Sequence, residues 1–179
     1  MPFPTPDVHV VIRPDAMYRL TKDLVYEGRD ELFTVPAGYL TDLASVPRFL
    51  TWLVPVAGIH DRAAIVHDYF CTALEDGKPV VPARDADGIF RRMLRELGVP
   101  TVRRWLYFVG VRWGALATPA RRPGWLQDAP AVLTVTALTL PVVVPASVVI
   151  GVGLVLYGVA EAVAKPVGRI RRSRNTRRV

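Results

Sequence analysis

Short apolar runs open the chain. Residues 8–12, 23–27 and 31–35 are rich in β-branched and aromatic side chains, and Gly28-Arg29-Asp30 separates the last two runs. Runs of this length that are divided by a Gly/Asp turn are typical of antiparallel strands. The pattern therefore predicts a small antiparallel sheet in the first third of the chain.

Apolar residues then recur at helical spacing. The spacing predicts helices over 60–74, 84–97 and 101–117, and an ordered loop with one short helical turn over 38–55. We expect the first two helices to end at Gly77 and Gly98. On the third helix we expect the buried side to carry Leu106, Val109, Trp113 and Leu116. The fold class is α+β, a small antiparallel sheet followed by about three helices.

A long charge-free segment follows the predicted helices. Residues 129–160 are 32 residues without a charge, and about 20 apolar residues suffice to cross the hydrocarbon core of a bilayer. The alternative is a hydrophobic helix that is buried in a large assembly. The domain organisation is then an α+β domain over 1–118, a linker over 119–128, a hydrophobic membrane segment over 129–164 and a basic tail over 165–179.

The topology of the membrane segment is left open by the sequence. As one helix, 32 residues measure about 48 Å against a core of about 30 Å. Pro141 and Pro145 divide the segment, but a hairpin that turns there has a first arm too short to cross. Basic residues flank both ends, and the N-terminus has no pattern of a secretory signal peptide. We therefore expect the body and the basic tail on the cytoplasmic side.

The positive charge of the chain is concentrated in its tail. The net charge is +7, and seven of the 23 basic residues lie in 165–179, where no acidic residue occurs. Removing those seven leaves 16 basic residues against 16 acidic ones over 1–164. A neutral body disfavours nucleic acid as a partner, and a basic tail directly after an apolar segment favours a lipid membrane. The single cysteine, Cys71, excludes an internal disulfide.

The densest set of polar side chains lies between residues 38 and 87. The candidates for catalysis are Asp42, Ser45, His67, Asp68 and Asp87, of which Asp42, His67 and Asp87 are also candidate ligands of a divalent metal ion. Carboxylates and a neutral imidazole can hold such an ion or divide acid and base roles. Ser45 lacks a Gly-x-Ser-x-Gly elbow, and the Val46-Pro47 that follows favours a turn.

The same residues also allow a purely structural interpretation. Asp68 and Asp87 are then caps or ion-pair partners of Arg62, Arg84 or Arg91, and His67 is a buried histidine with satisfied ring nitrogens. Consecutive helical residues diverge by about 100°, so His67 and Asp68 cannot both face one small ion. Cys71 lies one turn after His67, where a lone cysteine is typical of core packing.

Four ordered motifs resemble a small domain of unknown function that recurs in tailed-phage and prophage genomes. These are GYLTDLASVPRFL, AAIVHDYFC, ADGIFRRMLRELGVP and LYFVGVRWG, over about residues 30–115. The resemblance implies a phage or bacterial setting and no known activity. It singles out the residues of this chain that match the motifs of the family: Thr41, Asp42, Ser45, Pro47, His67, Asp68, Tyr69 and Asp87.

Two classes of function follow for this membrane-attached phage accessory protein. In the first, it is an interaction or structural module, built around a buried His/Asp network and binding phage or host proteins. In the second, it is a metal-assisted hydrolase that uses Asp42, His67 and Asp87, with Asp68 orienting the histidine. A closed, fully paired network favours the module, and an open cleft favours the enzyme.

Overall fold

The computed structural model of the chain describes residues 3–4, 7–14, 17–43, 46, 48–55 and 57–176, with the backbone alone at 49 and 166–176. The described strands form two small antiparallel sheets. The first has the order β1 (Val10–Ile12), β2 (Tyr18–Leu20), β5 (Leu40–Thr41), and the second is the hairpin β3 (Leu24–Glu27) and β4 (Leu32–Val35). The predicted hairpin around residues 28–30 is confirmed, whereas β2 and β5 were not predicted.

The β3–β4 hairpin alternates buried and exposed side chains. Leu24 is paired with Val35 and Tyr26 with Phe33, and all four side chains are buried on one face. Residues of the other parity are exposed or half-buried. This period of two gives the hairpin one apolar face, which packs on the first helix.

The helices begin and end close to the predicted residues. After the short helical turn η1 come three helices that form the body, a second turn η2 and a long final helix. Their bounds are η1 Arg48–Leu50, α1 Asp61–Glu75, α2 Ala83–Glu96, α3 Thr101–Gly114, η2 Pro119–Arg121 and α4 Trp125–Thr176. Thus the expected fold class, small antiparallel sheets followed by helices with a long apolar C-terminal helix, is confirmed.

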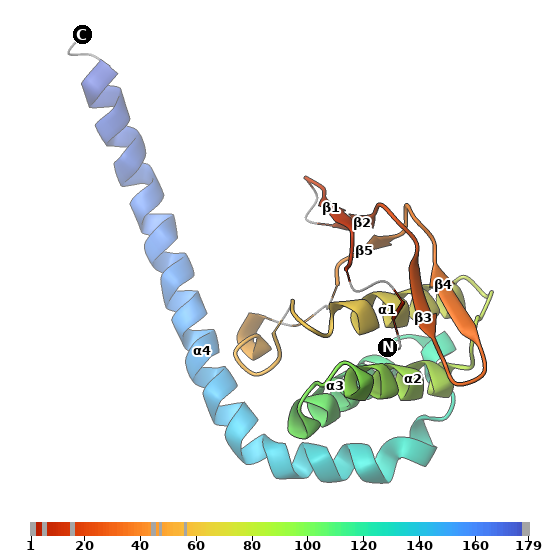
Figure 1. The fold of residues 1–179 in the computed structure, drawn as a ribbon. Helices are drawn as coiled ribbons and strands as arrows, with labels where there is room; N and C mark the ends of the chain where they lie inside the picture. The colour runs from red at the N-terminus through yellow and green to blue at the C-terminus, as the bar shows by residue number, and fades with distance from the viewer. Residues whose placement is uncertain are drawn as a thin grey trace. The chain divides into compact units, whose positions relative to one another are not determined.

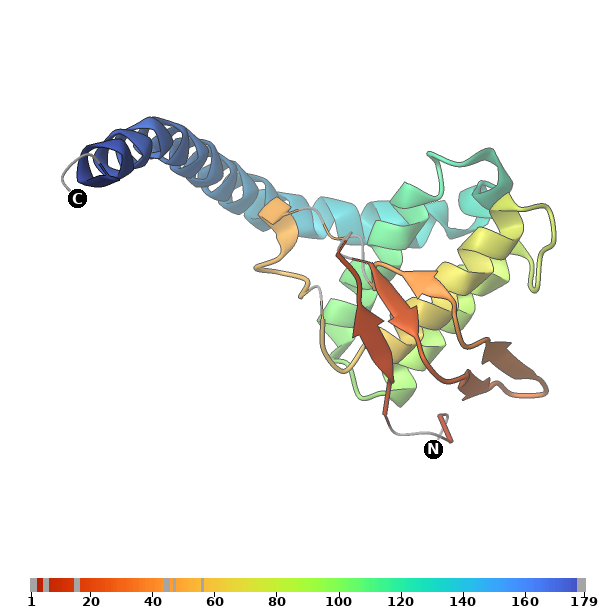
Figure 2. The same ribbon diagram turned by 90° about the horizontal axis from the view of Figure 1, so that it is seen from above.

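The strands and helices of the domain are layered. Figure 1 shows the strands on one side of α1, with α2 and α3 on its other side, and in Figure 2 the strands overlie α1. α1 contacts β3, β4 and α2, and α2 contacts α3. The core between these layers combines aliphatic side chains with a row of aromatic rings, in which Tyr26, Phe33 and Phe70 make successive contacts. α1 is therefore the central element, and its side chains reach both layers.

The buried side of α3 differs from the prediction. Tyr107, Phe108, Val109 and Arg112 are buried, whereas Trp113 is 41% exposed. Leu106 and Leu116 are only half-buried. The buried face is rotated because α3 packs between two partners, α2 on one side and the first residues of α4 on the other.

The structure divides into two compact units. The first is Met1–Leu138 and the second is Thr139–Val179, so the first unit includes the beginning of α4. The described helix runs through Pro141 and Pro145 without a turn. Its apolar part, Trp125–Lys165, has a mean hydropathy of 2.4 in its most apolar window, of which 0% is buried. By length and composition this helix is able to cross a membrane.

Candidate functional site: a buried charge network

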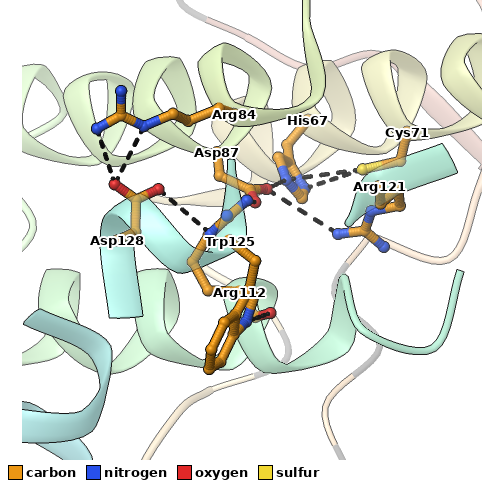
Figure 3. Close-up of polar contacts among 8 residues, drawn as sticks. All are labelled: His67, Cys71, Arg84, Asp87, Arg112, Arg121, Trp125 and Asp128. Atoms are coloured by element: carbon orange, nitrogen blue, oxygen red, sulfur yellow. Dashed lines mark hydrogen bonds and ion pairs between the residues drawn. The ribbon is translucent and has the colours of Figure 1, made fainter. Parts of the chain in front are cut away.

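Four charged side chains from four helices meet inside the domain. We call His67 of α1, Asp87 of α2, Arg112 of α3 and Asp128 of α4 the buried charge network (Figure 3). Asp87 is its centre, because His67 Nε2 lies 2.7 Å from one carboxylate oxygen and Arg112 Nη1 lies 2.8 Å from the other. Asp128 Oδ2 lies 3.4 Å from Arg112 Nε.

Two further arginines border the network. Arg84 donates from Nε and Nη2 to Asp128 Oδ1, at 3.2 and 3.1 Å. Arg121 of η2 places Nη2 4.0 Å from Asp87 Oδ1. Gly124, which precedes α4, lies so close to Arg84 that an added Cβ would be 2.7 Å from the Arg84 Cβ. The close approach at Gly124 brings the start of α4 against α2 and so places Asp128 within reach of both arginines.

The network is closed to solvent at its centre. Arg112 is 0% exposed, Asp87 2% and His67 8%. Trp125 covers the arginine by donating from Nε1 to the carbonyl of Arg112 at 2.8 Å. Among the residues that the structure describes, Arg112 Nη2 has no hydrogen-bond partner. A buried guanidinium must be matched by negative charge, which explains why Asp87 and Asp128 both face it.

The pairing shifts the pKa values of both groups at the centre. Burial alone would lower the pKa of His67, but the hydrogen bond to Asp87 and the contact with Cys71 raise it to about 9. Burial alone would raise the pKa of Asp87, but the hydrogen bonds and charges of His67 and Arg112 lower it below its usual value. Both groups are therefore charged at neutral pH.

Cys71 contacts His67 without aligning to it. Its sulfur lies 3.8 Å from Nδ1 and 3.7 Å from Nε2, and it is buried. A hydrogen bond to a ring nitrogen runs along one nitrogen's lone pair or N–H direction, and a sulfur equally distant from both is not on either. The arrangement fits core packing, as the sequence suggested for a lone cysteine.

Asp68 points away from the buried charge network into a second set of contacts. It accepts hydrogen bonds from Thr41 and Tyr39, and the Tyr39 hydroxyl also lies 3.0 Å from Thr72 Oγ1. Burial and the charge of the nearby Asp42 raise the pKa of Asp68. The expected divergence of His67 and Asp68 is thus what the structure shows.

Thr41 links the contacts of Asp68 to the loop that follows β5. The Thr41 side chain is fully buried, and its Oγ1 accepts a hydrogen bond from the backbone N–H of Leu43 at 3.0 Å. Leu43 has a positive φ of 67°, which is uncommon for a residue other than glycine. The side-chain bond to Thr41 stabilises this turn.

Not all the candidate residues come together. The structure joins His67 to Asp87 and places Asp68 beside the exposed Asp42, while Ser45 and Pro47 lie outside the described residues. Among the described residues, no three His, Cys, Asp or Glu side chains are arranged to hold a metal ion. α2 begins at Ala83, so Asp87 lies just beyond the first turn of this helix.

Sequence reasoning missed two of the four members of the buried charge network. Arg112 and Asp128 were not candidates. Arg84, which was expected to pair with Asp68 or Asp87, pairs with Asp128. One signal was present: Arg112 lies three residues after Val109, on the same helical face as a residue that was expected on the buried side of this helix.

A cleft elsewhere on the domain is open to solvent. It has a volume of about 500 Å³ and lies between the β3–β4 turn, the segment before α2 and α2 itself. Tyr26, Phe33, Val81, Asp85 and Arg92 are among the residues that line it, and His67 and Asp87 do not. The cleft therefore gives no access to the buried charge network.

Comparison with known proteins gives a family without an assigned activity. Neither the curated proteins nor the solved structures contain a match to the chain. A family model described as "Protein of unknown function (DUF1353)" matches residues 18–111, which include α1, α2 and most of α3. Because this match extends over more than half of the sequence, the chain belongs to the DUF1353 family of proteins of unknown function.

Proposed function

We propose that this chain is a membrane-attached interaction module in which the buried charge network maintains the fold and performs no chemistry. The observation that carries the proposal is that Asp87 is 2% exposed and has both carboxylate oxygens engaged, by His67 and Arg112. A catalytic carboxylate needs a free oxygen and a path for substrate. The paired and buried Asp87 instead links α2 to α1 through His67 and to α3 through Arg112.

The protonation of His67 supports the same conclusion. Its pKa of about 9 keeps the imidazole protonated at neutral pH. An imidazolium accepts no further proton, so at neutral pH His67 is not available as a general base. His67 therefore serves as a cation beside Asp87, and α1 and α2 are held together by that pair.

The alternative is a metal-assisted hydrolase that uses Asp42, His67 and Asp87. Its test is elemental analysis of the detergent-purified full-length protein, together with thermal unfolding with and without a chelator. We expect no stoichiometric metal and no chelator-dependent shift, and Asp42→Ala should leave the unfolding temperature within about 2 °C, as for a typical surface change. Stoichiometric zinc or manganese that is lost in Asp42→Ala would establish a metal site at Asp42 and contradict the purely structural role.

Attachment to a membrane is supported by α4. The helix is long enough to cross, and its exposed side chains from Leu140 to Val159 are uncharged and mostly apolar. Exposing such a surface to water is unfavourable in free energy, whereas contact with the hydrocarbon of a bilayer is favourable. The basic residues of 165–179 suit anionic headgroups, each adding on the order of 1 kcal/mol near the surface.

Cell fractionation tests the attachment. We expect the full-length protein in the membrane pellet, resistant to alkaline carbonate and released only by detergent. A variant in which Val149, Val152 and Leu156 are replaced by Asp interrupts the apolar segment and should appear in the soluble fraction. Wild-type protein that stays soluble after lysis without detergent contradicts the proposal.

For orientation, we propose that the domain and the basic tail both lie on the cytoplasmic side. Arg121 and Arg122 precede the apolar segment, and seven basic residues follow it, in 165–179. The positive-inside rule therefore favours the cytoplasmic face for both ends. A chain that keeps both ends on one face must bend within its apolar segment, whereas an unbent crossing by residues 139–164 places the basic tail on the other face. Reporter fusions at each end test this orientation. We expect both reporters to give the cytoplasmic signal, whereas a single crossing gives opposite signals at the two ends.

The phage or prophage setting rests on the four ordered sequence motifs, and the partner would be a phage or host protein. The open cleft near Tyr26 and Arg92 offers such a partner both apolar and charged contacts. Cross-linking of the membrane-bound protein in infected and uninfected cells tests this setting. An adduct that requires infection supports a phage partner.

A further inference from the structure

The first part of α4 belongs to the domain and is fixed along one face. Val132 is fully buried against Phe108 and Val109 of α3, and Trp113 Nε1 donates to Thr136 Oγ1 at 3.0 Å. Trp125 and Asp128 add the contacts with Arg112 that are described above. Residues 125–138 are therefore a surface helix of the domain and not a free stalk.

The opposite face of the same residues is exposed, uncharged and mostly apolar, with Gln127 and Thr134 as its polar side chains. Leu126 is 82% exposed, Leu133 49% and Leu138 74%. Only uncharged residues lie between them on that face, such as Pro130 and Ala137. The outer face of a helix on a soluble domain normally carries charged side chains. The uncharged outer face of residues 125–138 therefore indicates contact with something other than water.

The length of the remaining helix indicates what this surrounding is. Residues 139–164 are 26 residues, about 39 Å as a helix, which is enough to cross or to enter a hydrocarbon core of about 30 Å. The membrane segment therefore does not need residues 125–138, whether it crosses once or bends back. Pro141 has no N–H to bond the carbonyl of residue 137, which permits a bend where the span begins.

Groups that favour the headgroup level surround the exposed face. Trp113 is exposed beside Trp125, with ring centroids 5.5 Å apart, and tryptophan is enriched at membrane interfaces. Arg122 lies just before the helix, is exposed and suits anionic lipid. An uncharged outer face bordered by tryptophan and arginine has the composition of an interfacial helix.

We propose that the outer face of residues 126–138 lies in the headgroup region of the bilayer, so that the domain is held flat against the lipid surface. This inference rests on the proposed membrane attachment and adds to it the face by which the domain meets the membrane. Leu126, Leu133 and Leu138 contact lipid, while Trp125, Asp128 and Val132 contact the domain.

The test measures the lipid contact of single positions in the full-length protein. In a Cys71→Ala background, Leu126→Cys and Leu133→Cys are each labelled with an environment-sensitive dye and reconstituted into vesicles of phosphatidylcholine and phosphatidylglycerol. Ile12→Cys is the matched control, because Ile12 is similarly exposed but lies on β1, on the side of the domain away from the start of α4 (Figure 1). Circular dichroism confirms that each variant is folded.

Lipids that carry a nitroxide at the headgroup should quench the labels at 126 and 133 and leave the label at 12 bright. In the double variant Leu126→Glu/Leu133→Glu, a label at Leu138→Cys should lose its quenching while the protein still pellets with vesicles. Equal quenching at 12, 126 and 133 in pelleted protein overturns the inference alone. Labels that are shielded from water but not quenched by lipid also overturn it, in favour of a second copy. Protein that does not pellet overturns the membrane attachment as well.

Discussion

Asp87 determines the stability of the buried charge network, because removing its charge leaves the protonated His67 without a counter-charge and leaves Arg112 with Asp128 alone. We expect Asp87→Asn to lower the free energy of unfolding by about 3–5 kcal/mol, the usual cost of breaking a buried pair. Asp85→Asn is the matched control, since Asp85 is exposed in the first turn of the same helix and its loss should cost at most about 1 kcal/mol. Denaturant unfolding followed by tryptophan fluorescence measures both. Equal stability of the two variants contradicts the proposed structural role.

The raised pKa of His67 makes the stability depend on pH. The ordinary value is 6.5 and the folded value is about 9, so the folded protein binds one more proton than the unfolded chain between these values. The stabilisation is complete below pH 6.5 and is lost as the pH rises toward 9, with a slope on the order of 1 kcal/mol per pH unit. Unfolding measured across this range in wild type and His67→Gln should show the slope in wild type only. The same slope in both variants would assign it to other groups.

The sequence identified part of this site at the residue scale. His67 and Asp87 were candidates because they are polar residues on helices with apolar faces, and the structure joins them. Arg112 was not, since arginine in an amphipathic helix is normally a surface residue. Its burial depends on Asp87 and Asp128, which are 25 and 16 positions away, and such pairing appears only when the helices have packed.

At the scale of elements, α4 combines two environments on adjacent residues. Val132 is fully buried and Leu133 is half exposed. We expect Val132→Ala to lower the free energy of unfolding by about 2 kcal/mol, from two lost methyl groups and the cavity that they leave. Leu133→Ala should change it by less than about 0.5 kcal/mol, as is usual for a surface site. Unfolding in detergent measures both, and equal effects would show that this part of α4 is not docked on α3.

Elements with strong local patterns were predicted, and those that depend on distant pairing were not. The helices α1 and α2 end where Glu75 and Glu96 precede the predicted glycine stops. β2 and β5 are two or three residues long, and β5 is aligned by its register with β2 (Tyr18 with Thr41), which no local pattern indicates. The start of α4 was assigned to a linker and a membrane segment, because its apolar composition hid the inner face that Asp128 and Thr136 mark.

At the scale of the whole molecule, the contacts of α4 predict where the chain can be divided. A chain that ends at residue 138 retains the first compact unit, including the contacts of Asp128, Val132 and Thr136. A chain that ends at residue 126 loses all three and leaves Arg112 without its second carboxylate. We therefore expect the longer fragment to unfold cooperatively and the shorter one to be less stable by several kcal/mol, through the lost burial and the unbalanced charge.

The two fragments also separate the domain from its anchor. The fragment that ends at residue 138 keeps the exposed leucines of α4 but lacks the membrane segment 139–164. It should therefore bind vesicles reversibly and be released by alkaline carbonate, which leaves the full-length protein bound. The fragment that ends at residue 126 should not bind. Vesicle sedimentation measures all three proteins under the same conditions. If the two fragments sediment equally, the exposed face of α4 adds nothing to membrane contact, and the span alone accounts for attachment.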